Sequence, residues 1–207
     1  MQIDPATLGP LAAYKLGTSV IIPRPIAWTG SRSKDGQDNL APFSYFMGVS
    51  TRPPSVAISV ARQSDGPLKD TTKNILETEV FMVSIVPFSH ASQMNQCAAP
   101  WPPDVSEFEA CGLQPVMGQR VAAPRPAEAL ASMECKLVHS HDLGSTHLLV
   151  GEVLLYHLAD HIVREDKRGD MVVDAQALDS VCRLGTKDYA RIDQTFTLGR
   201  PPLQRDQ

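Results

Sequence analysis

The sequence has neither a long hydrophobic run nor an excess of positive charge. None of its 207 residues lies in an apolar segment near the roughly 20 residues of a membrane-spanning helix. Its 19 Lys and Arg against 23 Asp and Glu give a net charge of −4, which provides no basic field for nucleic acid or anionic lipid. Residues 1–4 lack the basic-then-apolar pattern of a signal peptide. We therefore expect a cytoplasmic protein that binds neither nucleic acid nor membrane.

Cysteine is sparse and scattered. The four cysteines are Cys97, Cys111, Cys135 and Cys182, and no two have C-x-x-C spacing. This pattern argues against a zinc ribbon, a thioredoxin-like motif and a disulfide scaffold. Cys135 stands in an apolar stretch and is expected to pack as a small hydrophobe. A catalytic thiol at Cys97 or Cys111 remains an alternative, although no helpful base is evident nearby.

The common motifs of phosphate, hydrolase and metal sites are also missing. The chain has no G-x-G, no phosphate-binding P-loop, no G-x-S-x-G and no H-E-x-x-H. These absences disfavour a Rossmann fold and the commonest kinase, hydrolase and metalloprotease classes. His139 and His141 would point the same way on a strand and could share a metal, but no third ligand is visible nearby. We expect no metal site.

Hydrophobic residues alternate with period two in several windows. Residues 55–61, 81–86 and 132–137 show this alternation, which predicts strands with one buried face. Further β-prone segments occupy residues 20–22, 26–31, 39–46 and 148–157. A polar turn at residues 34–38 separates two of them and indicates a hairpin. The spacing is typical of an antiparallel barrel or sandwich.

The expected helices are short and peripheral. Asp4 and Pro5 can begin one, Asp70 can cap a second that runs through Ile75 and Leu76, and Ser106 and Glu109 have capping-box spacing before Gly112.

The remaining segments are irregular. Proline-rich residues 98–103, with Trp101, predict a stiff excursion, and the charged residues 160–170 predict an exposed hairpin or loop. No internal repeat or linker divides the chain, so residues 1–207 are expected to form a single domain.

A first polar cluster surrounds Trp28. Arg24 stands between two prolines in an extended setting, where its guanidinium could hold a phosphate or carboxylate or pair with an acidic side chain. Trp28 could pack against a heterocycle or lie in the core. Thr29 and Ser31 share one strand face, so both hydroxyls could line a single pocket.

A second cluster follows at residues 39–44, with a third at residues 69–74. Pro42 removes a ladder donor and should lie at an edge or bulge, which exposes backbone groups to a ligand; an ordinary bulged strand is the alternative. Lys69, Asp70 and Thr71 lie where a helix begins, a setting that favours an anionic phosphate. Lys69 could equally be a solvated surface charge.

Taken in order, these motifs resemble the flavin reductase-like, FMN-binding split-barrel family. The resemblance rests on P-R-P-I-A-W at residues 23–28, on N-L-A-P-F-S at residues 39–44 with G-V-S at residues 48–50, and on K-D-T at residues 69–71. Segments 95–100, 107–113, 134–135, 151–153 and 184–189 look like the same family. The match covers roughly residues 15 to 200.

The resemblance implies a mainly β fold with peripheral helices, a six-stranded antiparallel Greek-key split barrel. It also implies a homodimer with one FMN per subunit at the interface and the partner's loop around Trp101 over the ring. Carried over residue by residue, it assigns to the cofactor Arg24, Trp28, Thr29, Ser31, Asn39, Leu40, Ala41, Ser44, Ser50, Lys69, Asp70, Thr71 and Asn74.

The implied function is FMN-dependent oxidoreduction of the flavin reductase type. Hydride would pass from NAD(P)H to flavin, and electrons would then reach a small acceptor or a partner oxygenase. The cofactor supplies the chemistry, so no acid–base side chain is required. Two alternatives stay open, a flavoredoxin-like electron carrier with tightly bound FMN and a non-enzymatic flavin-binding barrel. The K-D-T and A-P-F-S pattern argues against a pyridoxine phosphate oxidase-like activity.

Overall fold

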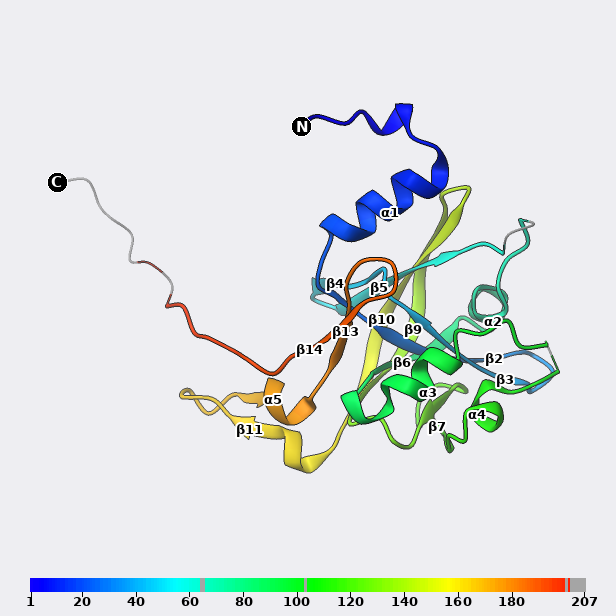
Figure 1. Cartoon of the computed structure of the whole chain (residues 1–207). Coiled ribbons are helices and arrows are strands. Elements are labelled where there is room, and N and C mark those ends of the chain that lie inside the picture. Colours follow the sequence, from blue (N-terminus) through cyan, green and yellow to red (C-terminus); the bar gives the residue numbers. More distant parts are fainter. Residues whose placement is uncertain (64–65, 103, 200, 202–207) are drawn as a thin grey trace.

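The computed structural model describes residues 1–63, 66–102, 104–199 and 201, which form a mainly β structure with short helices around it (Figure 1). The strands are β1 (Arg24–Pro25), β2 (Ala27–Arg32), β3 (Asp38–Phe43), β4 (Phe46–Thr51), β5 (Pro54–Ala61), β6 (Val80–Ile85), β7 (Pro115–Met117), β8 (Pro124–Pro126), β9 (Ala131–Asp142), β10 (Thr146–Leu158), β11 (Val163–Glu165), β12 (Met171–Val173), β13 (Val181–Arg183) and β14 (Tyr189–Arg191). The helices are α1 (Pro10–Val20), α2 (Asp70–Thr78), α3 (Ala91–Gln96), α4 (Glu107–Ala110) and α5 (Ala175–Leu178), with short 3-10 turns at η1 (Pro5–Thr7), η2 (Phe88–His90) and η3 (Asp160–Ile162).

Seven strands form the main sheet, in the order β3-β2-β6-β9-β10-β5-β4, and every pair is antiparallel. The mainly β class and the antiparallel barrel are as expected, but the sheet has seven strands where the resemblance implied six. The physical reason lies at Ser44 and Tyr45, where the chain bends out of the strand predicted over residues 39–46. Residues 39–43 of that segment lie in β3 and only Phe46 lies in β4, and the two strands are at opposite edges of the sheet.

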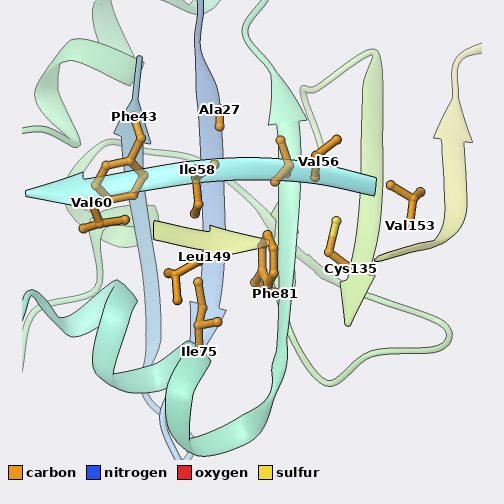
Figure 2. Close-up of a cluster of buried hydrophobic side chains, with 11 residues drawn as sticks. Ala27, Phe43, Val56, Ile58, Val60, Ile75, Phe81, Cys135, Leu149 and Val153 are labelled. Carbon is orange, nitrogen blue, oxygen red and sulfur yellow. The ribbon is translucent and has the colours of Figure 1, made fainter. Parts of the chain in front are cut away.

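One face of this sheet encloses the main core (Figure 2). Phe43 of β3, Ile58 of β5 and Phe81 of β6 meet there, although these strands are far apart in the order of the sheet. The sheet must therefore curl around the core. Ile75 of α2 joins the same cluster, so α2 packs its apolar side into the barrel. Burying such side chains contributes about 1.5–3 kcal/mol each.

The outer face is covered by helices and loops. Trp28 of β2 and Leu40 of β3 pack with Met94 of α3 and Phe108 of α4 in a second cluster. Farther along, Met82 of β6 is covered by the segment between β7 and β8. Strand β6 is consequently buried on both faces, whereas the alternation of its residues predicted that only one face would be buried.

A buried carboxylate fixes the segment between β7 and β8. Glu134 of β9 accepts backbone N–H groups from Gln119, Arg120 and Val121 at 2.7–2.8 Å, and its other close contact is His157 Nε2 at 2.6 Å. Burial alone would raise the pKa of Glu134, but these hydrogen bonds outweigh it and hold the pKa below its usual value. The carboxylate is therefore an ionised clamp inside the protein.

Three sequence expectations near helix ends differ from the structure. Val20 belongs to α1 and residues 21–22 form no strand, because the helix that starts with Gly9 at its N-cap and Pro10 at N1 runs on to Val20. Asp4 caps only the 3-10 turn η1. Lys69, not Asp70, occupies the N-cap of α2. The exposed hairpin or loop expected at residues 160–170 corresponds to the first strand and the turn of the β11–β12 hairpin, whose second strand lies beyond residue 170.

The edges of the molecule carry exposed apolar side chains. Leu11 and Tyr14 of α1 and Met47 and Val49 of β4 are all exposed, and the chain after β14 extends away from the body (Figure 1). Of the helices in the described residues, none combines the length and hydrophobicity needed to cross a bilayer.

Replacing Gly30 with alanine should destabilise the fold strongly. A Cβ there would lie 1.8 Å from the carbonyl oxygen of Pro124, since β8 crosses directly over β2. We expect a loss of at least about 2 kcal/mol in urea unfolding, near the upper part of the range for overpacking. Gly48→Ala is the control, because no heavy atom lies within 4 Å of its Cβ. Equal unfolding midpoints for the two variants would contradict the close approach.

Glu134→Gln should lower the free energy of unfolding at pH 7 by about 1.5–3 kcal/mol, because charge-assisted bonds are lost. The folded pKa is depressed, so this contribution is present above the ordinary value of 4.5 and disappears as the pH falls through the folded pKa. Urea unfolding at pH 7 and at successively lower pH should show the gap to wild type closing. Exposed Glu109→Gln is the matched control. A gap independent of pH would exclude the ionised clamp.

Candidate active site along strand β3

Three adjoining cavities follow the outer edge of β3, and we call them together the β3 groove. The central one has a volume of about 560 Å³, and its neighbours have about 410 and 380 Å³. Asn39 and Glu107 line the central cavity and one neighbour, while Phe43 and Lys69 line the central cavity and the other. Sites for cofactors and small ligands have volumes in this range, roughly 300–1,000 Å³.

The groove exists because β3 is an edge strand. It pairs with β2 on one side only, and the backbone N–H of Leu40 faces outward, where it donates to Glu107 Oε2 at 2.9 Å. Pro42 lies two residues on with the same orientation and has no N–H to leave unsatisfied, which confirms its expected place at an edge. The backbone of β3 is thus available to a ligand in the groove.

A buried polar network supports the groove from beneath. Asn39 Nδ2 donates to Ser31 Oγ at 3.2 Å and to Thr71 Oγ1 at 2.9 Å, and Asn74 Nδ2 donates to the same Ser31 oxygen at 3.2 Å. These side chains come from β2, β3 and α2, and all four are buried. The structure therefore brings together four residues that the sequence had nominated separately.

The central cavity has a cationic side. Lys69 stands at the N-cap of α2, and its side chain makes no capping hydrogen bond to the first N–H groups of that helix. Arg62 lines the same cavity, where it is held by Asp142 at 2.5 Å and by the carbonyl oxygen of Gly144 at 2.7 Å. A helix N-terminus beside two cations is a favourable place for a phosphate.

The opposite side of the groove is acidic. Glu107 of α4 lines both the central cavity and the one beside Asp38, and Asp70 lines both as well, although it begins α2 directly after Lys69. Burial raises the pKa of the Glu107 carboxyl, although the hydrogen bond from Leu40 opposes the change. An anionic group would be repelled here and attracted at Lys69, so the groove has a defined electrostatic direction.

Six of the nominated residues do not line the groove. The buried Arg24 uses its guanidinium to bind the carbonyl oxygens of Thr18, Ile21 and Leu184 at 2.5–2.7 Å, with Ser44 Oγ at 3.4 Å from its Nε. The others are Trp28 and Leu40 in the second core cluster, buried Thr29, buried Ser31 in the network beneath the groove, and exposed Ser50 on β4. Seven do line it: Asn39, Ala41, Ser44, Lys69, Asp70, Thr71 and Asn74.

Sequence reasoning missed Arg62 and Glu107 as groove residues. Glu107 is 67 positions from Leu40, and Arg62 is 80 positions from Asp142. Such contacts depend on tertiary packing and leave no local pattern. The capping-box spacing at Ser106 did mark the start of α4, but the predicted side-chain cap does not form, and Glu107 binds β3 instead.

The histidine pair and the cysteines were the other candidate centres in the sequence. His139 and His141 stack on β9 with ring centroids 6.4 Å apart, and within the described residues no group of three or more His, Cys, Asp or Glu could hold a metal. All four cysteines are free and buried. Burial raises the pKa of Cys97 and Cys135, which disfavours reactive thiolates at neutral pH.

Residues 19–175 match the family described as flavin reductase like domain. This chain belongs to that family. Nitrilotriacetate monooxygenase component B from Bacillus cereus is 35% identical, with a TM-score of 0.87 over 96% of this chain and 98% of that one. The 2-nitrobenzoate 2-nitroreductase of Pseudomonas fluorescens is 28% identical, with a TM-score of 0.88 over 100% and 99%. A protein from Shewanella frigidimarina assigned as a flavin reductase with a split barrel domain is 25% identical, with a TM-score of 0.84 over 97% and 100%.

Membership of this family identifies the chain as a flavin-related oxidoreductase with a split-barrel fold. The β3 groove fits a flavin in volume and in donor chemistry. It combines a cationic helix N-terminus, an accessible strand edge and the aromatic side chains of Phe43 and Trp101.

Proposed function

We propose that this protein binds FMN in the β3 groove and transfers hydride from NAD(P)H to the flavin. The observation that carries the proposal is the groove itself, an exposed strand edge with Lys69 and the N-terminus of α2 at one side. These features are not combined in the cavity lined by Arg125 and His157 or in the one lined by Pro10 and Lys15.

The residues that would hold the phosphate are Lys69, Arg62 and the first backbone N–H groups of α2. The hydroxyl of Thr71 and the amide of Asn39 would offer uncharged partners. The backbone of Ala41 and its neighbours would meet the polar edge of the ring. When bound, FMN accepts hydride from a reduced nicotinamide and passes electrons onward.

The side chains of the groove would orient the cofactor and need not move protons. Glu107 disfavours the phosphate at the acidic side, which leaves Lys69 as its anchor. The network beneath Asn39 fixes the wall of the groove in advance, so binding costs little reorganisation. Five further nominated residues would support this arrangement from within the chain or contact the cofactor from the second copy of a dimer: Arg24, Trp28, Thr29, Leu40 and Ser50.

The electron acceptor would be a small molecule or a partner oxygenase. One structural neighbour is a component of a monooxygenase, and another is a nitroreductase acting on 2-nitrobenzoate. Both fit a protein that reduces a flavin and then delivers electrons. A flavoredoxin-like carrier is the alternative, and it predicts slow reaction with nicotinamides.

An anaerobic absorbance experiment separates these functions. Purified protein with FMN should show a bound-flavin spectrum that bleaches within seconds of adding NADH or NADPH, and the faster donor identifies the preference. A bound flavin that stays oxidised with both donors would contradict the reductase and support the carrier. A free-flavin spectrum would contradict the site as well.

Lys69→Ala should weaken FMN binding by about 1–3 kcal/mol, roughly 5-fold to 150-fold in Kd, because a charge-assisted bond to phosphate is lost. Lys167→Ala is the control, since Lys167 is exposed in the turn between β11 and β12 and lines none of the three cavities of the groove. Isothermal titration calorimetry measures the affinity of both variants for FMN and for riboflavin. Equal FMN affinity in the two variants would remove Lys69 from the phosphate site.

We also propose a homodimer with the cofactor at its interface. Tyr45, Met47 and Val49 alternate along the start of β4 and are 40–60% exposed. Leu11 and Tyr14 of α1 add further apolar surface, and Tyr14 lines the same cavity as Tyr45. This apolar surface therefore borders the β3 groove. A second copy that covered it would bury exposed hydrophobic area and enclose the cofactor.

Met47→Glu should shift the protein from dimer to monomer, because a charge would be buried at the interface. Sedimentation velocity gives the mass, and FMN titration under the same conditions should show weaker binding. Met171→Glu is the control, since Met171 is 73% exposed on β12, outside this surface. A dimer that survives Met47→Glu unchanged would place the interface elsewhere.

A further inference from the structure

Two of the buried cysteines lie in contact. Cys97 Sγ donates to Cys111 Sγ at 3.3 Å, and the two residues are 2% and 6% exposed. The other two thiols differ, because Cys135 donates to the carbonyl oxygen of Met133 and Cys182 to that of Ala190. Only the first pair, among the four cysteines, brings two sulfurs within bonding reach.

The contact joins the two ends of one groove segment. Cys97 follows α3, Cys111 follows α4, and thirteen residues (98–110) lie between them. From this segment come Trp101 and Glu107, which line the central cavity and the acidic one beside it. A bond between the two sulfurs would close this segment into a loop at its base.

We propose that Cys97 and Cys111 form a reversible disulfide that closes the groove segment, with a hydroperoxide as the oxidant. Two S–H bonds and the O–O bond of the peroxide break and one S–S bond forms. The thiols lose two electrons and two protons, and hydrogen peroxide is reduced to two molecules of water. The peroxide first converts one thiol to a sulfenic acid. The other thiol then attacks that sulfur, and the hydroxyl group leaves as water.

The local structure permits this reaction. A disulfide needs the sulfurs to come roughly 1.2 Å closer than the present 3.3 Å. Both cysteines lie at the C-caps of helices of six and four residues, outside every sheet, so no strand ladder opposes the movement. Cys97 lines the central cavity, which gives a small peroxide a route to one sulfur.

Burial raises the pKa of both thiols, so they are protonated at neutral pH and react slowly. Under this proposal the pair reacts only when peroxide accumulates, because little thiolate is present to attack it. This inference stands apart from the proposed function, because it requires the thiol pair and the groove segment but no bound flavin.

The test is oxidation of the purified full chain with hydrogen peroxide, without added flavin. Titration of thiols after denaturation should fall from four to two per chain and return to four with dithiothreitol. Peptide mapping should show residues 97 and 111 joined. The closed thirteen-residue loop should raise Tm by several degrees, as expected for a loop of about this length, and the reductant should reverse the shift.

Cys111→Ala removes the partner and should abolish both the cross-link and the Tm shift. Cys182→Ala is the matched control, because Cys182 is 6% exposed, as Cys111 is, and it should lose two of its three remaining thiols with the same cross-link. Retention of all four thiols in the wild type would overturn the proposal. So would a different pairing, or a sulfinic acid at Cys97 without a cross-link.

Discussion

The exposed edge of β3 is the feature on which the candidate site depends. The sheet curls around its core, and the bend at Ser44 and Tyr45 leaves β3 at one edge and β4 at the other. An edge strand must satisfy its outward backbone groups by some other means. In this protein Glu107 binds one of them, Pro42 has no N–H to satisfy, and the rest of the edge opens into the groove.

Electrostatics give the groove its direction. Lys69 and Arg62 line the central cavity with the N-terminus of α2, and Glu107 of α4 lines the central cavity and the acidic one beside Asp38. The buried network around Ser31 holds the strand and the helix in register, so the cationic and acidic sides keep a constant separation. A rigid, polarised groove suits a chain that positions a cofactor and leaves the redox chemistry to it.

Local patterns predicted much of this arrangement. The turn at residues 34–38 produced the expected β2–β3 hairpin, and Pro42 marked an edge because its ring removes a ladder donor. Tertiary effects account for what was missed. The β-prone Val20 is helical, since the helix that begins at Pro10 extends to it. Arg24 is directed to three carbonyl oxygens, and Glu107 reaches across 67 residues, neither of which a local spacing could reveal.

The most direct test of the account is a crystal structure of the protein with FMN. The account predicts electron density for the flavin along β3, with its phosphate against Lys69 and the first turn of α2 and its ring beside Ala41. A flavin bound in another cavity, or one with its phosphate at the acidic side beside Glu107, would contradict it.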